Sequence, residues 1–126
     1  MKKILLVATA ILAMTTQSFA NTPAADNNRA QECLLAEGLT TCKSAIVYFN
    51  RELHGNVSNK DACRIANHLS ASEFMYGYKS GNNAMVVKAQ KRQRVIAATC
   101  PNPYKDDAAS TLQSENNIIN NGIKLK

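Results

Sequence analysis

The stretch Glu32–Leu53, ECLLAEGLTTCKSAIVYFNREL, joins two cysteines across a Gly-Leu-Thr-Thr turn and continues into a segment with helical spacing. Apolar residues at i, i+3, i+4, i+7 and i+11 form one face of an α-helix. The residues at this spacing are Cys42, Ala45, Ile46, Phe49 and Leu53. Gly38 lies where a helix C-terminus is expected, and Thr40 or Thr41 is available to cap the next helix. The stretch therefore predicts two helices joined at a crosslinked corner, the second over about 42–53.

The N-terminus has the pattern of a secretory signal peptide. Lys2 and Lys3 precede an apolar run of 11 residues at 4–14, and Ser18 and Ala20 satisfy the small-x-small rule of signal peptidase. Because a membrane-spanning helix needs roughly 20 apolar residues, the run is too short for a membrane anchor. We expect cleavage after Ala20 and export, with the periplasm as destination because the short Lys-Lys start is typical of bacteria.

Cleavage after Ala20 would leave 106 residues (126 minus 20), which is enough for one domain. The signal takes two of the 15 Lys and Arg residues with it, so the net charge becomes 13 minus 9, or +4. That surplus is too small to indicate a nucleic-acid-binding protein. It suits a protein partner with acidic groups or a position near anionic lipid, although no second apolar stretch is long enough to cross a membrane.

All four cysteines follow the signal, at Cys33, Cys42, Cys63 and Cys100. An even number in an oxidising compartment predicts two disulfides, for which three pairings are open. We favour Cys33–Cys42 with Cys63–Cys100, since these would close the corner and tie two later helices; Cys42–Cys63 with Cys33–Cys100 stays open. No C-x-x-C occurs, and intervals of 8, 20 and 36 residues fit no common zinc motif. No metal or cofactor is expected.

Segments around the corner predict further helices. A flexible lead-in is expected at 21–28, followed by a first helix over about 28–37. Ser58 and Asp61 have the spacing of a capping box, which predicts a helix start at Ser58. A second start of the same kind follows at 70–73.

The C-terminal part of the chain predicts one more helix and a polar tail. The segment Ser-Gly-Asn-Asn at 80–83 predicts a turn. It precedes a helical pattern over about 84–99, which ends before two prolines. The Asn-rich segment 106–126 is expected to be a flexible tail or one marginal helix. Taken together, the chain predicts an all-α domain over 29–105, a small bundle of four or five short helices stapled by two disulfides.

No catalytic arrangement is visible in the sequence. His54 lies at an expected helix end, where partial positive charge suits the helix dipole. His68 lies within a helix, where packing is a commoner role than general-base catalysis. The serines lack a nucleophile-elbow context, and Glu32 and Glu37 do not share a helix face. We therefore expect a protein that is not an enzyme.

Two groups of residues are candidates for contact with a partner. Phe74, Tyr76 and Tyr78 form an aromatic group, whose spacing of two distributes it around a helix and also fits a role in the core. A basic face on the last expected helix is usually solvated but can also contact a partner protein or a membrane surface. Its members are Lys88, Lys91, Arg92 and Arg94.

The chain resembles the TrbM/KikA family of conjugal transfer proteins in several segments. These are Glu32-Cys33-Leu34-Leu35, then Gly38 and Cys42, then Ala45–Phe49, and the basic segment Arg92–Pro101 that ends in Cys-Pro. The resemblance covers about 31–101, and some family members have more cysteines than this chain. It implies an exported accessory protein encoded with a type IV secretion or mating-pair formation system. It supplies no enzymatic activity and no active-site residues.

The leading hypothesis is a non-enzymatic periplasmic accessory protein of conjugative DNA transfer, which acts through protein–protein contacts during assembly of the channel or pilus. The alternative is a periplasmic immunity protein that neutralises a secreted cell-wall-degrading toxin, because such proteins are also small, helical, exported and disulfide-bonded. A peptidoglycan-cleaving enzyme is disfavoured, since the sequence shows neither a convincing acid pair nor a reactive cysteine. Neighbouring transfer genes would favour the first hypothesis and a neighbouring toxin gene the second.

The exported protein should begin at Asn21 and have a mass four hydrogens below that of the fully reduced chain, because two disulfides remove four thiol hydrogens. Intact mass spectrometry of the protein recovered from the periplasm, before and after reduction, measures both quantities. Thiols that react with an alkylating reagent in the native protein would contradict the prediction of two disulfides.

Overall fold

The protein is a bundle of helices arranged around its longest one. The computed structural model describes residues 23–35 and 38–121, and regular secondary structure in these ranges is entirely helical, as the sequence predicts. The helices are α2 (Pro23–Leu35), α3 (Thr40–Leu53), α4 (Asn59–Ser80), α5 (Asn83–Thr99) and α6 (Tyr104–Asn121). The predicted signal peptide lies outside the described residues.

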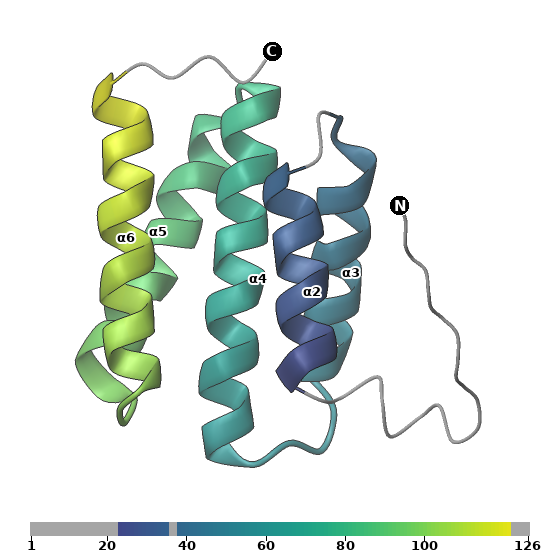
Figure 1. Cartoon of the computed structure of the whole chain (residues 1–126), viewed down its shortest axis with the longest axis vertical. Helices are drawn as coiled ribbons and strands as arrows, with labels where there is room; N and C mark the ends of the chain where they lie inside the picture. Colours follow the sequence, from purple (N-terminus) through teal and green to yellow (C-terminus); the bar gives the residue numbers. More distant parts are fainter. Residues whose placement is uncertain (1–22, 36–37, 122–126) are drawn as a thin grey trace.

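Successive helices run in opposite directions, so that α2, α4 and α6 point one way and α3 and α5 the other (Figure 1). The central helix is α4, which contacts all four other helices. Helices α2 and α3 lie against one side of it, and α5 and α6 against the other. Within the described ranges α2 and α6 both touch α4 but do not touch each other.

The start and end of α4 follow from local capping. The hydroxyl of Ser58 accepts a hydrogen bond from the backbone N–H of Asp61 at 3.1 Å, which confirms the predicted start. The helix ends at Gly81, whose φ of +78° is a left-handed conformation that favours glycine. The second start predicted at 70–73 is wrong, because α4 continues through it. There the Ser72 hydroxyl donates to the carbonyl of His68 at 2.9 Å and caps nothing.

Helices α4 and α5 approach closely near their connecting turn. A Cβ at Gly77 would lie 3.0 Å from the carbonyl oxygen of Asn82 and 3.1 Å from Val86 Cγ2, so the position has no room for a larger residue. Asn82 also caps α5, since its side chain accepts from the N–H of Met85 at 3.2 Å. The predicted turn at 80–83 is thus confirmed.

Two disulfides, Cys33–Cys42 and Cys63–Cys100, crosslink the bundle, and they confirm the pairing favoured from the sequence. The first joins α2 to α3, and the second joins early α4 to the residue that follows α5. With a sequence separation of 37, the second closes a loop worth about 3–4 kcal/mol in the chain-entropy account.

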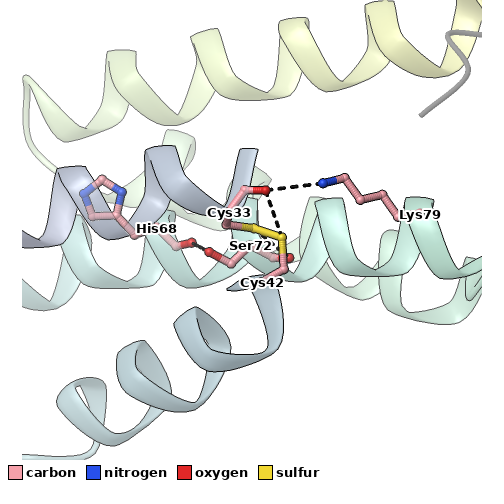
Figure 2. Close-up of a disulfide and its surroundings, with 5 residues drawn as sticks. All are labelled: Cys33, Cys42, His68, Ser72 and Lys79. Carbon is pink, nitrogen blue, oxygen red and sulfur yellow. Dashed lines mark hydrogen bonds between the residues drawn. A yellow bond between two sulfur atoms is a disulfide. The ribbon is translucent and has the colours of Figure 1, made fainter. Parts of the chain in front are cut away.

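The first disulfide lies against α4, with His68, Ser72 and Lys79 following one another along that helix (Figure 2). Cys33 Sγ lies 4.0 Å from the carbonyl oxygen of Ser72. The ammonium of Lys79 donates to the carbonyl of Cys33 at 3.4 Å, so it satisfies one of the carbonyls that a helix end leaves unpaired. The crosslinked corner is therefore held on α4 as well as within itself.

The apolar face predicted for the second helix of the corner is confirmed in α3. Cys42, Ala45 and Phe49 are fully buried there, and Ile46 and Leu53 pack at the edge of the core. The predicted cap at Thr40 or Thr41 is wrong. The N-cap of α3 is Leu39, whose side chain makes no capping hydrogen bond.

The segment expected as a tail is largely helical, because residues 104–121 form α6. This helix packs on α5 and α4, and Ala108 and Glu115 are buried in the contact. Its sequence is Asn-rich and has few apolar residues, so intrinsic propensity alone would leave it marginal. Tertiary contacts therefore decide its structure.

The first helix begins at Pro23, earlier than expected, because Asp26 in its first turn is held by two other helices. Asp26 is fully buried. The hydroxyl of Tyr48 in α3 donates to Asp26 Oδ1 at 3.1 Å, and the guanidinium of Arg64 in α4 donates to Oδ2. Burial, and next the charge of Asp26, raise the pKa of Tyr48 to about 12. The carboxylate thus joins α2, α3 and α4.

Replacing Asp26 with Ala should cost about 3–5 kcal/mol in the free energy of unfolding, because it leaves the nearly buried Arg64 guanidinium without its main acceptor. Tyr48→Phe should cost only about 1 kcal/mol, since it removes one hydrogen bond and leaves the ion pair. Urea unfolding of the oxidised proteins measures both, with the exposed Asp106→Ala as the surface control. Equal losses in Asp26→Ala and Tyr48→Phe would contradict this role of Asp26.

Candidate functional site

The face of α4 between α2 and α6 carries an open groove of about 390 Å³, which we call the α2–α6 groove. Figure 1 shows these two helices on either side of α4. The groove is lined by Asn27, Ala30, Gln31, Leu34, Asn67, His68, Ala71, Met75, Asp107, Ser110, Thr111, Ser114, Glu115 and Ile118.

The lining residues form one stripe on each helix. On α2 they follow the spacing i, i+3, i+4 and i+7 from Asn27. On α6 they follow i, i+3, i+4, i+7, i+8 and i+11 from Asp107. These are the positions by which a helix packs on a neighbour, and α2 and α6 do not use them on each other. The groove is therefore a helix-packing surface that the described part of the chain leaves uncovered.

The two ends of the groove differ in polarity. Because α2, α4 and α6 run in the same direction, the first lining residues of each helix lie at one end and the last at the other. The first end contains Asn27, Asn67 and Asp107, which are polar. The second end contains Leu34 and Ile118 beside Met75, which are apolar.

The groove is acidic although the chain as a whole is basic. Its lining includes the carboxyl groups of Asp107 and Glu115, and the described lining residues include neither lysine nor arginine, whereas the chain has a formal net charge of +6. Arg64 lies beyond the polar end, where its guanidinium is already paired with Asp26 and Asp61. The field inside the groove therefore favours a positively charged group.

Two neighbouring side chains of α4 give the polar end its chemistry. Asn67 is only 9% exposed, and its Oδ1 has no hydrogen-bond partner. A buried acceptor of this kind is costly to leave unpaired. His68 stacks on Phe49 with ring centroids 5.4 Å apart, and burial lowers its pKa below the ordinary value of 6.5. His68 is thus a neutral imidazole at pH 7, and Asn67 Oδ1 is a buried acceptor beside it.

The wall of the groove on α6 holds a buried carboxyl group, Glu115, which is 4% exposed. Gln93 Nε2 donates to it at 2.9 Å and Gln90 Nε2 at 3.4 Å, both from α5. Burial raises its pKa to about 7, and the two glutamine hydrogen bonds only partly offset that rise. Glu115 therefore changes its protonation state near neutral pH, unlike an ordinary surface glutamate.

The groove offers little for covalent or metal chemistry. All four cysteines are in disulfides, so the chain has no thiol nucleophile in this state. Ser72 lies one helical turn after His68, and its hydroxyl donates to the backbone carbonyl of His68. Across residues 23–35 and 38–121, no three His, Cys, Asp or Glu side chains are placed to hold a metal ion. The arrangement is suited to binding.

The aromatic group predicted as a contact surface belongs largely to the core. Phe74 is fully buried, and Tyr78 stacks on it with ring centroids 5.8 Å apart. Tyr76 is half-buried and also packs against the core. The prediction of partner contact is therefore wrong for Phe74, because α4 is covered on that side by other helices.

The predicted basic group divides into two parts. The guanidinium of Arg92 donates to Glu73, which is buried in α4, and to the Ser70 hydroxyl at 3.3 Å. Arg92 is thus a structural residue that compensates a buried carboxylate. Exposed on the outer face of α5 are Lys88, Lys91 and Arg94. His54 is also exposed, at the C-cap of α3.

Sequence reasoning missed the acidic residues of the groove because it took their segment to be a tail. A signal was present in that segment. Ala108, Thr111, Glu115 and Ile118 follow a helical spacing, and the structure buries Ala108 and Glu115 fully and the other two in part. The polar residues Asp107 and Ser114 lie on the flank of that stripe and could have been placed with it.

The chain matches no protein-family model, no curated protein and no solved structure. None of the helices at 23–35 and 38–121 has both the length and the apolar character needed to cross a bilayer.

The stability of the protein relative to Glu115→Gln should fall as the pH rises from about 4.5 to about 7. The folded state binds the Glu115 proton more tightly than the unfolded state, whose pKa is near 4.5, so each pH step through this window disfavours folding. The change should be on the order of 3 kcal/mol. Urea unfolding of both proteins between pH 4.5 and 8 measures it, and His68 cancels because both proteins contain it. A difference that stays constant with pH would contradict the buried, titrating carboxyl group.

Proposed function

We propose that this chain is an exported accessory protein that acts through protein–protein contact, within a conjugative type IV secretion or mating-pair formation system. The observation that carries the binding part is the α2–α6 groove. The exposed members of the stripes on α2 and α6, among them Leu34, Asp107 and Ser114, line a groove that no other described helix fills. A second protein that enters the groove would cover these side chains.

The sequence and the disulfides support export. The apolar run after Lys2 and Lys3 and the small residues before Asn21 predict signal cleavage. Two disulfides, one of them fully buried, are typical of proteins that mature in an oxidising compartment. A periplasmic location is part of the proposal on these grounds.

The resemblance to TrbM/KikA proteins supports the link to conjugation. It rests on the crosslinked corner from Glu32 to Phe49 and on the basic segment that ends at Cys100-Pro101. In the structure these segments lie in α2, α3 and the end of α5; one disulfide joins α2 to α3, and the other joins α4 to Cys100 after α5. The proposal assigns no enzymatic activity and no cofactor.

An in-frame deletion of the gene in a plasmid donor should lower transfer frequency by at least about tenfold, and the intact gene supplied in trans should restore it, because a missing assembly factor limits the number of working channels. Mating assays with matched donor growth measure the effect. A complementing copy that lacks the signal, residues 2–20, should fail, since the proposed role lies outside the cytoplasm.

Unchanged transfer in the deletion strain would overturn the conjugation assignment. The alternative, a periplasmic immunity protein, would then be tested by exposing the same deletion strain to secreted cell-wall-degrading toxins. Protection that depends on this gene would establish the immunity role.

A further inference from the structure

We propose that the α2–α6 groove binds an amphipathic helix of a partner protein, which lies antiparallel to α4 and carries Lys or Arg in its last turn. This inference rests on the proposed function, because it specifies the class of partner that the exported protein contacts. It is carried by the geometry of the groove and by the chemistry of its two ends.

The shape of the groove calls for a helix. Its lining stripe on α6 extends from Asp107 to Ile118, a rise of about 16 Å or three helical turns. The lining stripes on α2 and α4 run alongside the α6 stripe and are each about two turns long. Small residues, Ala30 and Ala71, lie midway along the groove, where they allow a guest backbone to approach α4 closely. A guest helix would complete the set of helices around α4.

The polar end calls for a cationic donor. Asp107 is exposed there as a carboxylate, and the buried Oδ1 of Asn67 lacks a donor. With no lysine or arginine among the described lining residues, the exposed Asp107 carboxylate is open to a group from outside, whereas Asn67 Oδ1 is shielded from solvent. A guanidinium or ammonium at this end gains a charge-assisted hydrogen bond to Asp107.

The opposite end calls for an apolar anchor. Leu34 is 45% exposed at this end, Ile118 is half-buried beside it, and the buried Met75 forms the floor. Covering Leu34 and Ile118 contributes about 25 cal/mol per Å² of apolar surface. The guest helix is therefore expected to have a large apolar residue about two turns away from its cation, which matches the distance from Asn67 to Met75 along α4.

The direction of the guest helix follows from the helix dipoles. Since α2, α4 and α6 are parallel, an antiparallel guest opposes all three dipoles. In that direction its C-terminal turn reaches the polar end, beside Asp107. A Lys or Arg in the last turn of a helix is also favoured by the dipole of that helix itself, so both effects place the cation at the same end.

The test uses the mature, oxidised protein and a fluorescein-labelled synthetic helical peptide of about 16 residues. Along one face the peptide has leucine in its second turn, alanine one turn later and two lysines in its last turn. Fluorescence anisotropy at low ionic strength should show saturable binding. Replacing the lysines with glutamates should abolish it. No saturable binding of the lysine peptide, or equal binding of both peptides, would overturn the proposal.

Variants of the protein localise the contact. Asp107→Asn should weaken binding of the lysine peptide about tenfold. Asp106→Asn is the matched control, because it makes the same charge change at the neighbouring exposed position, which does not line the groove. Equal weakening by the two variants would show a diffuse charge effect and overturn the proposal. So would a concentration-dependent dimer of the protein alone that Asp107→Asn dissociates, because the occupant would then be a second copy.

A mating assay separates this inference from the proposed function. Ser114→Arg introduces a cation into the exposed wall of the groove and should lower transfer at least about tenfold in the complemented deletion strain. Gln113→Arg is the matched control, since it adds the same side chain beside the groove on α6. If deletion abolishes transfer while both variants restore it fully, the proposed function stands and the groove is not the contact.

Discussion

Burial of α4 on nearly all sides is the constraint on which the rest of the structure depends. Every other described helix packs on it, yet its sequence is only moderately apolar, so polar side chains enter the interior with it. Glu73 and Ser70 are among them, and each needs a partner from a neighbouring helix. Arg92 of α5 serves both. The position of α5 is thereby set by a buried charge as well as by apolar contact.

The same rule explains the position of α2. Its moderately polar sequence offers little apolar surface to bury, and the helix is held by a carboxylate, Asp26, which accepts from Tyr48 and Arg64. An arrangement of the helices that separated Asp26 from Arg64 would leave a buried charge without a partner, which is strongly destabilising. The pair therefore specifies how α2, α3 and α4 fit together. The two disulfides add crosslinks at the corner and at the Cys63–Cys100 end of the bundle.

The groove is a consequence of how few helices surround α4. Four neighbours leave one strip of its surface uncovered, between α2 and α6. That strip contains a polar residue, Asn67, whose acceptor is satisfied by none of the neighbours. Among the described residues, lysine and arginine side chains lie outside the groove, some of them on the outer face of α5, and the groove is lined by acidic residues instead. Under the proposed binding role, this separation of charge would favour a cationic partner.

The sequence by itself determined the helical class, the apolar face of α3 and the start of α4 at Ser58, which depend on local periodicity and on caps. It favoured one disulfide pairing but left the pairing of Cys42 with Cys63 open, and the structure decided between them. Only the tertiary structure decided that Pro23–Leu35 and Tyr104–Asn121 are helices that flank a groove, and that Phe74 and Arg92 belong to the interior. Both helices lack a strong local signal, because they are stabilised by contacts with residues distant in sequence, such as Asp26 with Arg64 and Gln93 with Glu115.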